Sequence, residues 1–227
     1  MINEILWFIL MLVNFTGIII AYKIFGRIGL FVWVAIAIIL ANIQVAKLIR
    51  FFGMVTAMGN IIYGTTFLAT DILTERYGVK EARKAVLVGF FSLIATTVIM
   101  QLTLIFVPAQ EDTLSPHLEK IFCFMPDVMV ASLTAYLISQ FHDVWAFEFW
   151  KRKTKGRYLW LRNNASTMVS QLIDNLTFTT LFFVVFNPEF VSALGFRGIF
   201  EIFITSYIMK FVVAICDTPF IYISKKI

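Results

Sequence analysis

Two acidic residues four positions apart are the most chemically informative pair in this sequence. Asp71 and Glu75 lie in the segment ATDILTERYG at positions 69–78, where a long apolar run ends. On a helix this spacing places both carboxylates on one face. A carboxylate at the centre of a membrane helix costs about 2.5 kcal/mol or more unless water or a partner group meets it. A chain that keeps such groups is expected to use them, for a ligand, a proton or an ion pair.

Further polar side chains recur at helical spacing in two later apolar runs. Tyr136, Gln140 and Asp143 are separated by four and three residues, and Gln171 and Asp174 by three. Each set therefore lies along one face of a helix. Polar side chains of membrane helices face the bundle interior or a water-filled cavity, and not lipid. The stripes predict a polar site between these helices.

Each of these polar groups also has a purely structural interpretation. Serine and threonine hydroxyls in membrane helices often bond to their own backbone or to a neighbouring helix. Glu75 and Asp143 could lie near the membrane surface, where a charge costs less. Asp174, expected near mid-membrane, could form a structural ion pair with Lys47 or Lys210. Lys210 would then be its counter-ion, unless its amine reaches back to the interface.

The composition indicates which elements position these side chains. Hydrophobic residues make up 60% of the chain and charged residues 15%, whereas a soluble domain carries about 25% charged residues. At about 20 residues per membrane-crossing helix, the chain accommodates six or seven spans and leaves no room for a separate soluble domain. The expected fold is an all-α, polytopic bundle of six to seven transmembrane helices, forming one transmembrane domain over residues 1–227.

The apolar runs and the charges between them determine the expected topology. The runs cover positions 5–22, 28–48, 57–73, 85–107, 122–141, 165–186 and 199–215. Basic residues concentrate in the first, third and fifth connecting loops and in the C-terminal tail, so these regions are expected to be cytoplasmic and the N-terminus external. The count falls to six if the first or last run lies in the interface. The net charge of +5 thus reflects topology, and no nucleic-acid partner is expected.

Four sequence blocks resemble a known transporter family. They are ANIQVAK at 41–47, ATDILTERYG at 69–78 followed by KEARKAV, AYLISQFHDV at 135–144, and LWLRNNASTMVSQLIDN at 159–175. In this order they resemble the queuosine precursor transporters, also called the vitamin uptake transporter family, which is similar to the substrate-binding subunits of energy-coupling-factor transporters. The resemblance implies uptake of 7-cyano-7-deazaguanine or 7-aminomethyl-7-deazaguanine across a bacterial cytoplasmic membrane by a stand-alone carrier. The alternative is a subunit of an energy-coupling-factor importer of a vitamin or nucleobase.

The polar residues suit a deazaguanine ligand. A guanine-like edge presents N–H donors beside a carbonyl acceptor, which carboxylates and side-chain amides can match. A flat heterocycle also stacks on aromatic rings. In our hypothesis Asp71 or Asp174 meets the donor edge, the amides complete the polar set and an aromatic ring such as that of Tyr136 stacks. The predicted substrate-binding residues are Asn42, Gln44, Asp71, Tyr136, Gln140, Gln171 and Asp174.

A second set of residues is expected to form a gate or ion-pair network. Arg162 follows the basic loop at 151–157 and could pair with Glu75 or Asp143 at the cytoplasmic side, latching an inner gate. The alternative for Arg162 is an ordinary interfacial cation under the positive-inside rule. The predicted members of this network are Lys47, Glu75, Asp143, Arg162 and Lys210.

Other functional classes lack their sequence features. The chain has no GxxxxGK[ST] phosphate-binding loop, HExxH motif or GxSxG motif, so it is not expected to be an enzyme. Its two histidines, His117 and His142, are not placed to form a metal site with the cysteines, and no cofactor or metal is expected. Cys123 and Cys216 form no CxxC motif and are expected to be small buried side chains. A membrane enzyme or a channel is the alternative class.

Energy coupling and assembly are left open by the sequence. Ala37 and Ala41 are four residues apart and allow close helix contact, within the chain or with a partner membrane protein. A stand-alone carrier could bind a proton with its substrate at the buried carboxylates, or act as a uniporter. The expected partners are the lipid bilayer and a small deazaguanine molecule, with a homo-oligomer or an energy-coupling partner as further possibilities.

Overall fold

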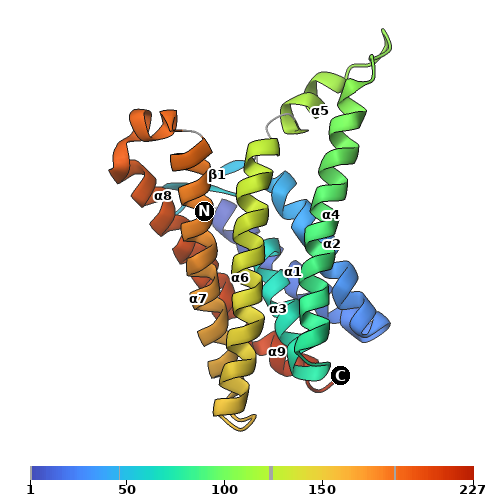
Figure 1. Ribbon diagram of the computed structural model, residues 1–227, viewed down its shortest axis with the longest axis vertical. Helices are drawn as coiled ribbons and strands as arrows, with labels where there is room; N and C mark the ends of the chain where they lie inside the picture. Colours follow the sequence, from blue (N-terminus) through green and yellow to red (C-terminus); the bar gives the residue numbers. More distant parts are fainter. Residues whose placement is uncertain (1, 46, 123–124, 187) are drawn as a thin grey trace.

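The computed structural model describes residues 2–45, 47–122, 125–186 and 188–227 (Figure 1). Its α-helices are α1 (Ile2–Phe25), α2 (Arg27–Gln44), α3 (Asn60–Arg76), α4 (Val79–Ile105), α5 (Ser115–Phe122), α6 (Met125–Lys153), α7 (Leu159–Thr179), α8 (Glu189–Cys216) and α9 (Thr218–Ser224). A π-helical segment, η1 (Thr180–Phe186), continues α7. The predicted all-α bundle is confirmed, with the addition of one short antiparallel hairpin of β1 (Leu48–Phe51) and β2 (Met54–Ala57).

Each predicted apolar run overlaps a long helix, but the runs at 28–48 and 57–73 extend into the hairpin, and the run at 122–141 starts at the end of α5 and includes 123–124, which lie outside the described residues. By length and composition, five helical stretches of the described chain can cross a membrane: Ile2–Phe25, Arg27–Gln44, Val79–Ile105, Leu159–Phe186 and Gly195–Ser224. The runs at 57–73 and 122–141 correspond to α3 and α6, which are absent from this set. α3 is only 17 residues long, and α6 ends in a cluster of basic residues. Both helices also carry polar stripes, which lower their hydropathy.

Helix α3 occupies the centre of the bundle. All of its residues from Ile61 to Thr74 are buried, and it contacts α1, α2, α4, α6, α7, α8 and α9. A helix that is enclosed on every face must bury its polar groups as well as its apolar ones. The threonine hydroxyls of α3 donate to carbonyl oxygens of their own helix, whereas Tyr63, Asp71 and Glu75 interact with side chains of neighbouring helices.

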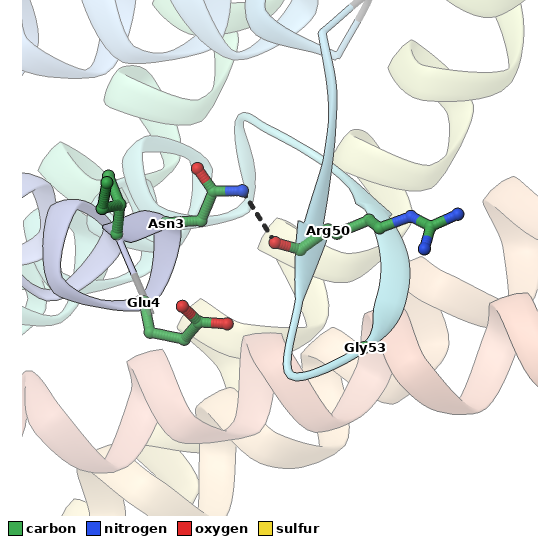
Figure 2. Close-up of a pocket in the computed structure, with 5 residues that line it drawn as sticks. Asn3, Glu4, Arg50 and Gly53 are labelled. Carbon is green, nitrogen blue, oxygen red and sulfur yellow. Dashed lines mark hydrogen bonds between the residues drawn. The ribbon is translucent and has the colours of Figure 1, made fainter.

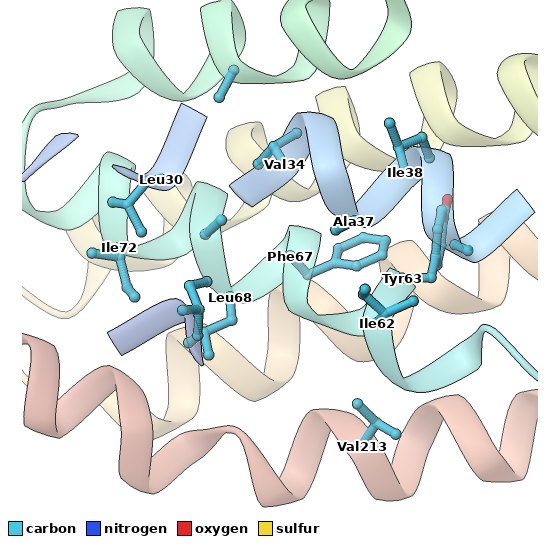
Figure 3. Packing of buried hydrophobic residues seen from close by; sticks show 14 of the residues in the cluster. Leu30, Val34, Ala37, Ile38, Ile62, Tyr63, Phe67, Leu68, Ile72 and Val213 are labelled. Atoms are coloured by element: carbon cyan, nitrogen blue, oxygen red, sulfur yellow. The ribbon is translucent and has the colours of Figure 1, made fainter. Parts of the chain in front are cut away.

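Apolar packing joins α2 to α3 (Figure 3). Ala37 of α2 faces the ring of Phe67, and both residues are fully buried. Near the end of α2, a Cβ on Gly59 would come within 2.7 Å of the carbonyl oxygen of Ala41, and Gly59 has a φ of +97°. The Ala37–Ala41 pair thus mediates close helix packing inside the chain.

The β1–β2 hairpin holds the start of α1 at one end of the bundle (Figure 2). Asn3 Nδ2 donates to the backbone oxygen of Arg50 at 2.9 Å, and Glu4 Oε1 accepts from the backbone nitrogen of Phe52 at 3.0 Å. A pocket of about 540 Å³ lies between these residues and Gly53. We call this end of the molecule the hairpin end.

The C-terminal segment lies at the other end of α3. Lys225 Nζ is 2.8 Å from Glu75 Oε1, in the last turn of α3, whereas the hairpin precedes the first turn of α3. We call this second end, with Arg76, Lys151 and Lys225, the basic end. The two termini therefore lie at opposite ends of the bundle, as an odd number of crossings requires.

Candidate functional site

Polar side chains of α3, α6, α7 and α8 face one another inside the bundle, and we call this stack of residues the polar column. Helices α6 and α7 lie side by side along its length (Figure 1). On α7 the buried polar residues recur every three or four positions, so that they follow one face. The α7 members are Arg162, Asn163, Ser166, Thr167, Ser170, Gln171 and Asp174. The other members are Tyr63, Thr66, Thr70, Asp71, Thr74 and Glu75 on α3, Tyr136, Ser139, Gln140 and Asp143 on α6, and Lys210 and Asp217 on α8 and its C-terminal cap.

Asp174 has all the partners that a buried carboxylate needs. Lys210 Nζ lies 2.6 Å from its Oδ2, the Tyr63 hydroxyl donates to Oδ1, and Ser139 Oγ donates to the same oxygen at 3.1 Å. The Lys210 ammonium also lies 5.3 Å from the centre of the Tyr63 ring. The structure thus pairs Asp174 with Lys210, the second of the two cations considered from the sequence. A ligand at Asp174 would have to displace one of three donors.

The two glutamines of the polar column differ in their hydrogen bonding. Gln140 Nε2 donates to Thr66 Oγ1 at 2.6 Å, and Gln140 Oε1 accepts from Thr70 Oγ1 at 3.2 Å. Gln171 is fully buried, but within the described chain neither its Oε1 nor its Nε2 has a hydrogen-bond partner. Gln140 therefore fastens α6 to α3, whereas the Gln171 amide keeps both its donor and its acceptor available.

The Tyr136 side chain is buried beside Tyr63, with ring centres 6.3 Å apart. Its hydroxyl also has no hydrogen-bond partner among the described residues. Helix α4 approaches this hydroxyl at Gly89, where a Cβ would come within 2.3 Å of it. Tyr136 thus offers an aromatic face and an unpaired hydroxyl one helical turn from Gln140.

Three buried carboxylates lie near one another closer to the basic end, and we call Asp71, Asp143 and Asp217 the carboxylate cluster. Asp71 interacts electrostatically with both of the others. Thr167 Oγ1 donates to Asp71 Oδ2 at 3.4 Å, and Asn163 Nδ2 donates to Asp217 Oδ1 at 2.7 Å. All three acids are fully buried. The structure therefore places Asp143 inside the bundle, away from its outer surface.

At the basic end a single carboxylate joins four parts of the chain. Glu75 of α3 contacts Arg162 of α7, Lys151 of α6 at 3.2 Å and Lys225 of the C-terminal tail at 2.8 Å. The buried Arg162 guanidinium lies 5.4 Å from the centre of the Phe147 ring. Lys151 Nζ also donates to the last carbonyl oxygens of α3, where a cation is favoured by the helix dipole. Of the two acids considered for Arg162, the structure selects Glu75.

The remaining predicted residues lie towards the hairpin end. Asn42 Nδ2 donates to the carbonyl oxygen of Ile38 in its own helix, Gln44 is half-buried at the end of α2, and Lys47 is exposed. Lys47 forms no ion pair within the residues that the structure describes. From the start of α3 to Glu75 the distance along the helix is about 22 Å. The single network predicted to include Lys47 is therefore divided into separate ion pairs, because its members occupy different levels of the bundle.

Some members of the polar column were not predicted as site residues from the sequence. Tyr63 and Asn163 each contact an acid on another helix, and Asp217 caps α8 just beyond the last apolar run. The helical spacing of Gln171 and Asp174, continued towards the start of α7 through Thr167, would have found Asn163. In the described part of the chain no group of three or more histidine, cysteine, aspartate or glutamate side chains could hold a metal ion. Cys216 is a half-buried free thiol, and Cys123 lies outside the described residues.

An apolar bundle with polar residues enclosed between its helices is the architecture of a multi-pass membrane transporter. A family model described as "Putative vitamin uptake transporter" matches residues 57–224. The chain belongs to this family of vitamin uptake transporters, which confirms the membership expected from the four sequence blocks. A curated relative from Bacillus subtilis (strain 168), named "Probable queuosine precursor transporter", is 42% identical over 227 residues, covering 100% of this chain and 96% of the relative. No solved structure matches the chain.

Proposed function

We propose that this protein imports a queuosine precursor, 7-cyano-7-deazaguanine or 7-aminomethyl-7-deazaguanine, across a bacterial cytoplasmic membrane as a stand-alone carrier. The observation that carries the proposal is the 42% identity, over the full chain, to a relative named as a transporter of such precursors. Identity over the whole length implies that the relative shares this arrangement of helices. The basic end is proposed to face the cytoplasm.

The proposed substrate site lies among α3, α6 and α7, with α4 beside the Tyr136 hydroxyl, where buried polar atoms are unpaired. The Gln171 amide, the Tyr136 hydroxyl and Asp71 Oδ1 are buried and without hydrogen-bond partners in the described residues. A guanine-like ring offers N–H donors to Asp71 and a donor–acceptor edge to the Gln171 amide. The ring of Tyr136 offers a stacking surface. Gln140 and Asp174 are proposed to line this site and to change partners when the substrate binds.

Access to this site requires movement at the ends of the bundle. Asp71, Tyr136, Gln140 and Gln171 are all 0% exposed, so this conformation is closed around them. Glu75 and its three cations are proposed to form the latch at the cytoplasmic side, since they join α3 to α6, α7 and the C-terminal tail. A pocket of about 410 Å³ lies directly outside this latch, lined in part by Glu75 and Lys151.

The one feature that the sequence offered for the energy-coupling-factor alternative is used within the chain. The Ala37–Ala41 pair that could have received a partner membrane protein is buried, with Ala37 0% and Ala41 7% exposed. It packs within the chain and presents no surface to a second protein.

Transport by the purified protein tests the proposal. Full-length protein in proteoliposomes is expected to take up labelled 7-cyano-7-deazaguanine, and unlabelled guanine derivatives would measure selectivity. Gln171→Ala should weaken substrate binding about tenfold or more, because two hydrogen bonds to a buried ligand are lost. The matched control is Gln101→Ala, since Gln101 bonds to the backbone of Phe122 and lies outside the polar column. Absence of uptake by the wild type would contradict the proposed function, and equal affinity of both variants would contradict the site.

A further inference from the structure

The carboxylate cluster brings three buried acids together without a paired cation among the described residues. Asp71 comes from α3, Asp143 from α6 and Asp217 from the junction of α8 with α9, and all three are 0% exposed. Burial of an ionised carboxylate costs several kcal/mol, and a like charge beside it raises that cost. Asp143 and Asp217 both act on Asp71. Ionisation of all three carboxylates in this closed conformation is therefore costly.

The neighbouring cations are paired with other acids. Arg162, Lys151 and Lys225 contact Glu75, and Lys210 contacts Asp174. On α6, the ring of His142 lies beside the cluster residue Asp143 in sequence, but its Nδ1 is 2.9 Å from Ser170 Oγ. The thiol of Cys216 precedes Asp217 on α8. Across residues 2–45, 47–122, 125–186 and 188–227, no ion pair reaches any member of the carboxylate cluster.

Unpaired acceptors point to a missing hydrogen donor at this place. In the described chain, both oxygens of Asp143, Oδ1 of Asp71 and Oδ2 of Asp217 lack a hydrogen bond of regular geometry, although Asp143 interacts with Asp71 and with the hydroxyls of Ser166, Thr167 and Ser170. Asn163 is fully buried and its amide is turned into the cluster by the bond to Asp217, yet its Oδ1 is also unpaired. Each unpaired buried acceptor costs about 1–3 kcal/mol. A carboxyl O–H supplies the donor that these atoms lack and removes a negative charge at the same time.

We propose that the carboxylate cluster is a proton-binding site and that the carrier moves at least one proton inward with each substrate molecule. The proposal rests on the proposed function as an importer. A proton from the outer aqueous phase forms an O–H bond with a carboxylate of the cluster before the bundle closes. Opening at the basic end admits water, which solvates the carboxylate, so the O–H bond breaks and the proton passes to the cytoplasm. Closure over an unprotonated cluster is penalised by the desolvation described above, and this penalty links proton movement to substrate movement.

Uptake driven by a pH gradient tests the coupling. Proteoliposomes with the full chain are given an acidic exterior, while potassium and valinomycin hold the membrane potential at zero. Labelled 7-cyano-7-deazaguanine is the probe because it is neutral. One proton per substrate supports up to about tenfold accumulation for each pH unit of gradient. Asp217→Asn should exchange labelled for unlabelled substrate without a gradient but should lose the accumulation, whereas Glu119→Gln, an exposed acid on α5, should keep both.

An infrared measurement makes the two proposals separable. Purified protein without substrate should show the C=O stretch of a protonated, buried carboxyl at neutral pH, and this band should weaken in Asp143→Asn. Substrate exchange that ignores the pH gradient would overturn proton coupling and leave the proposed function standing. Absence of any exchange would count against the proposed function, and the infrared band would then decide the proton site alone. A spectrum without that band would overturn the site.

Discussion

Two residues of α7, one turn apart, show how much buried polar groups of this protein differ in their hydrogen-bond partners. Asp174 receives hydrogen bonds or an ion pair from Lys210, Tyr63 and Ser139, whereas the Gln171 amide, one turn away, receives none from the described residues. A fully partnered carboxylate stabilises the closed bundle, and an unpaired amide is a cost unless a ligand or water meets it. The number of hydrogen-bond partners therefore distinguishes structural polar groups from ligand-binding ones better than the residue type does.

Removal of the Lys210 charge should destabilise the closed bundle. Lys210→Met leaves a buried Asp174 carboxylate without its cation, a change that costs about 3–5 kcal/mol in such pairs. We expect a clearly lower thermal unfolding temperature in detergent. The double variant Asp174→Asn, Lys210→Met should recover part of the loss, because no uncompensated charge remains. Lys120→Met, at an exposed site on α5, is the control, and equal stability of Lys210→Met and this control would rule out the pair as a stabilising contact.

At the scale of elements, the end of α3 is the point at which several helices are joined. The Glu75 carboxylate contacts cations of α6, α7 and the C-terminal tail, and Lys151 also bonds to the carbonyl oxygens of Thr74 and Glu75. These contacts tie the end of α3 to its neighbours. A movement of α3 relative to α6 and α7 therefore requires the Glu75 ion pairs to separate. The same contacts would thus control access to the carboxylate cluster from the basic end.

Loss of the Glu75 charge should open the basic end more often. Glu75→Gln keeps the shape of the side chain but removes its attraction to three cations, so the half-buried thiol of Cys216 should react faster with a maleimide. The measurement uses a Cys123→Ser background, which leaves Cys216 as the thiol that reacts. Glu148→Gln breaks only an exposed pair with Arg152 and should leave the rate unchanged. A rate in Glu75→Gln equal to that of the control would show that Glu75 does not hold this end closed.

At the scale of the whole molecule, the sequence predicts where the helices lie along the chain but not which helices pack against one another. Hydropathy and charge locate every long helix, because each must either meet lipid or enclose polar groups. The spacing of Gln140 and Asp143, or of Gln171 and Asp174, reveals which face of a helix is polar but not which helix it meets. The bond between Tyr63 and Asp174 joins residues 111 positions apart. The complete burial of Asp143 likewise depends on how α3, α6 and α7 pack together.

The orientation of the bundle is the prediction that connects all three scales, because the direction of transport and of proton release depends on it. The chain enters α1 at the hairpin end and finishes at the basic end, so a single accessible site at each end is enough for a test. In a background without native cysteines, Glu111→Cys in the loop before α5 should react with an impermeant maleimide in intact cells. Lys155→Cys, in the loop between α6 and α7, should react only after the membrane is opened. The reverse pattern would place the Glu75 latch outside, and the carboxylate cluster would then release its proton away from the cytoplasm.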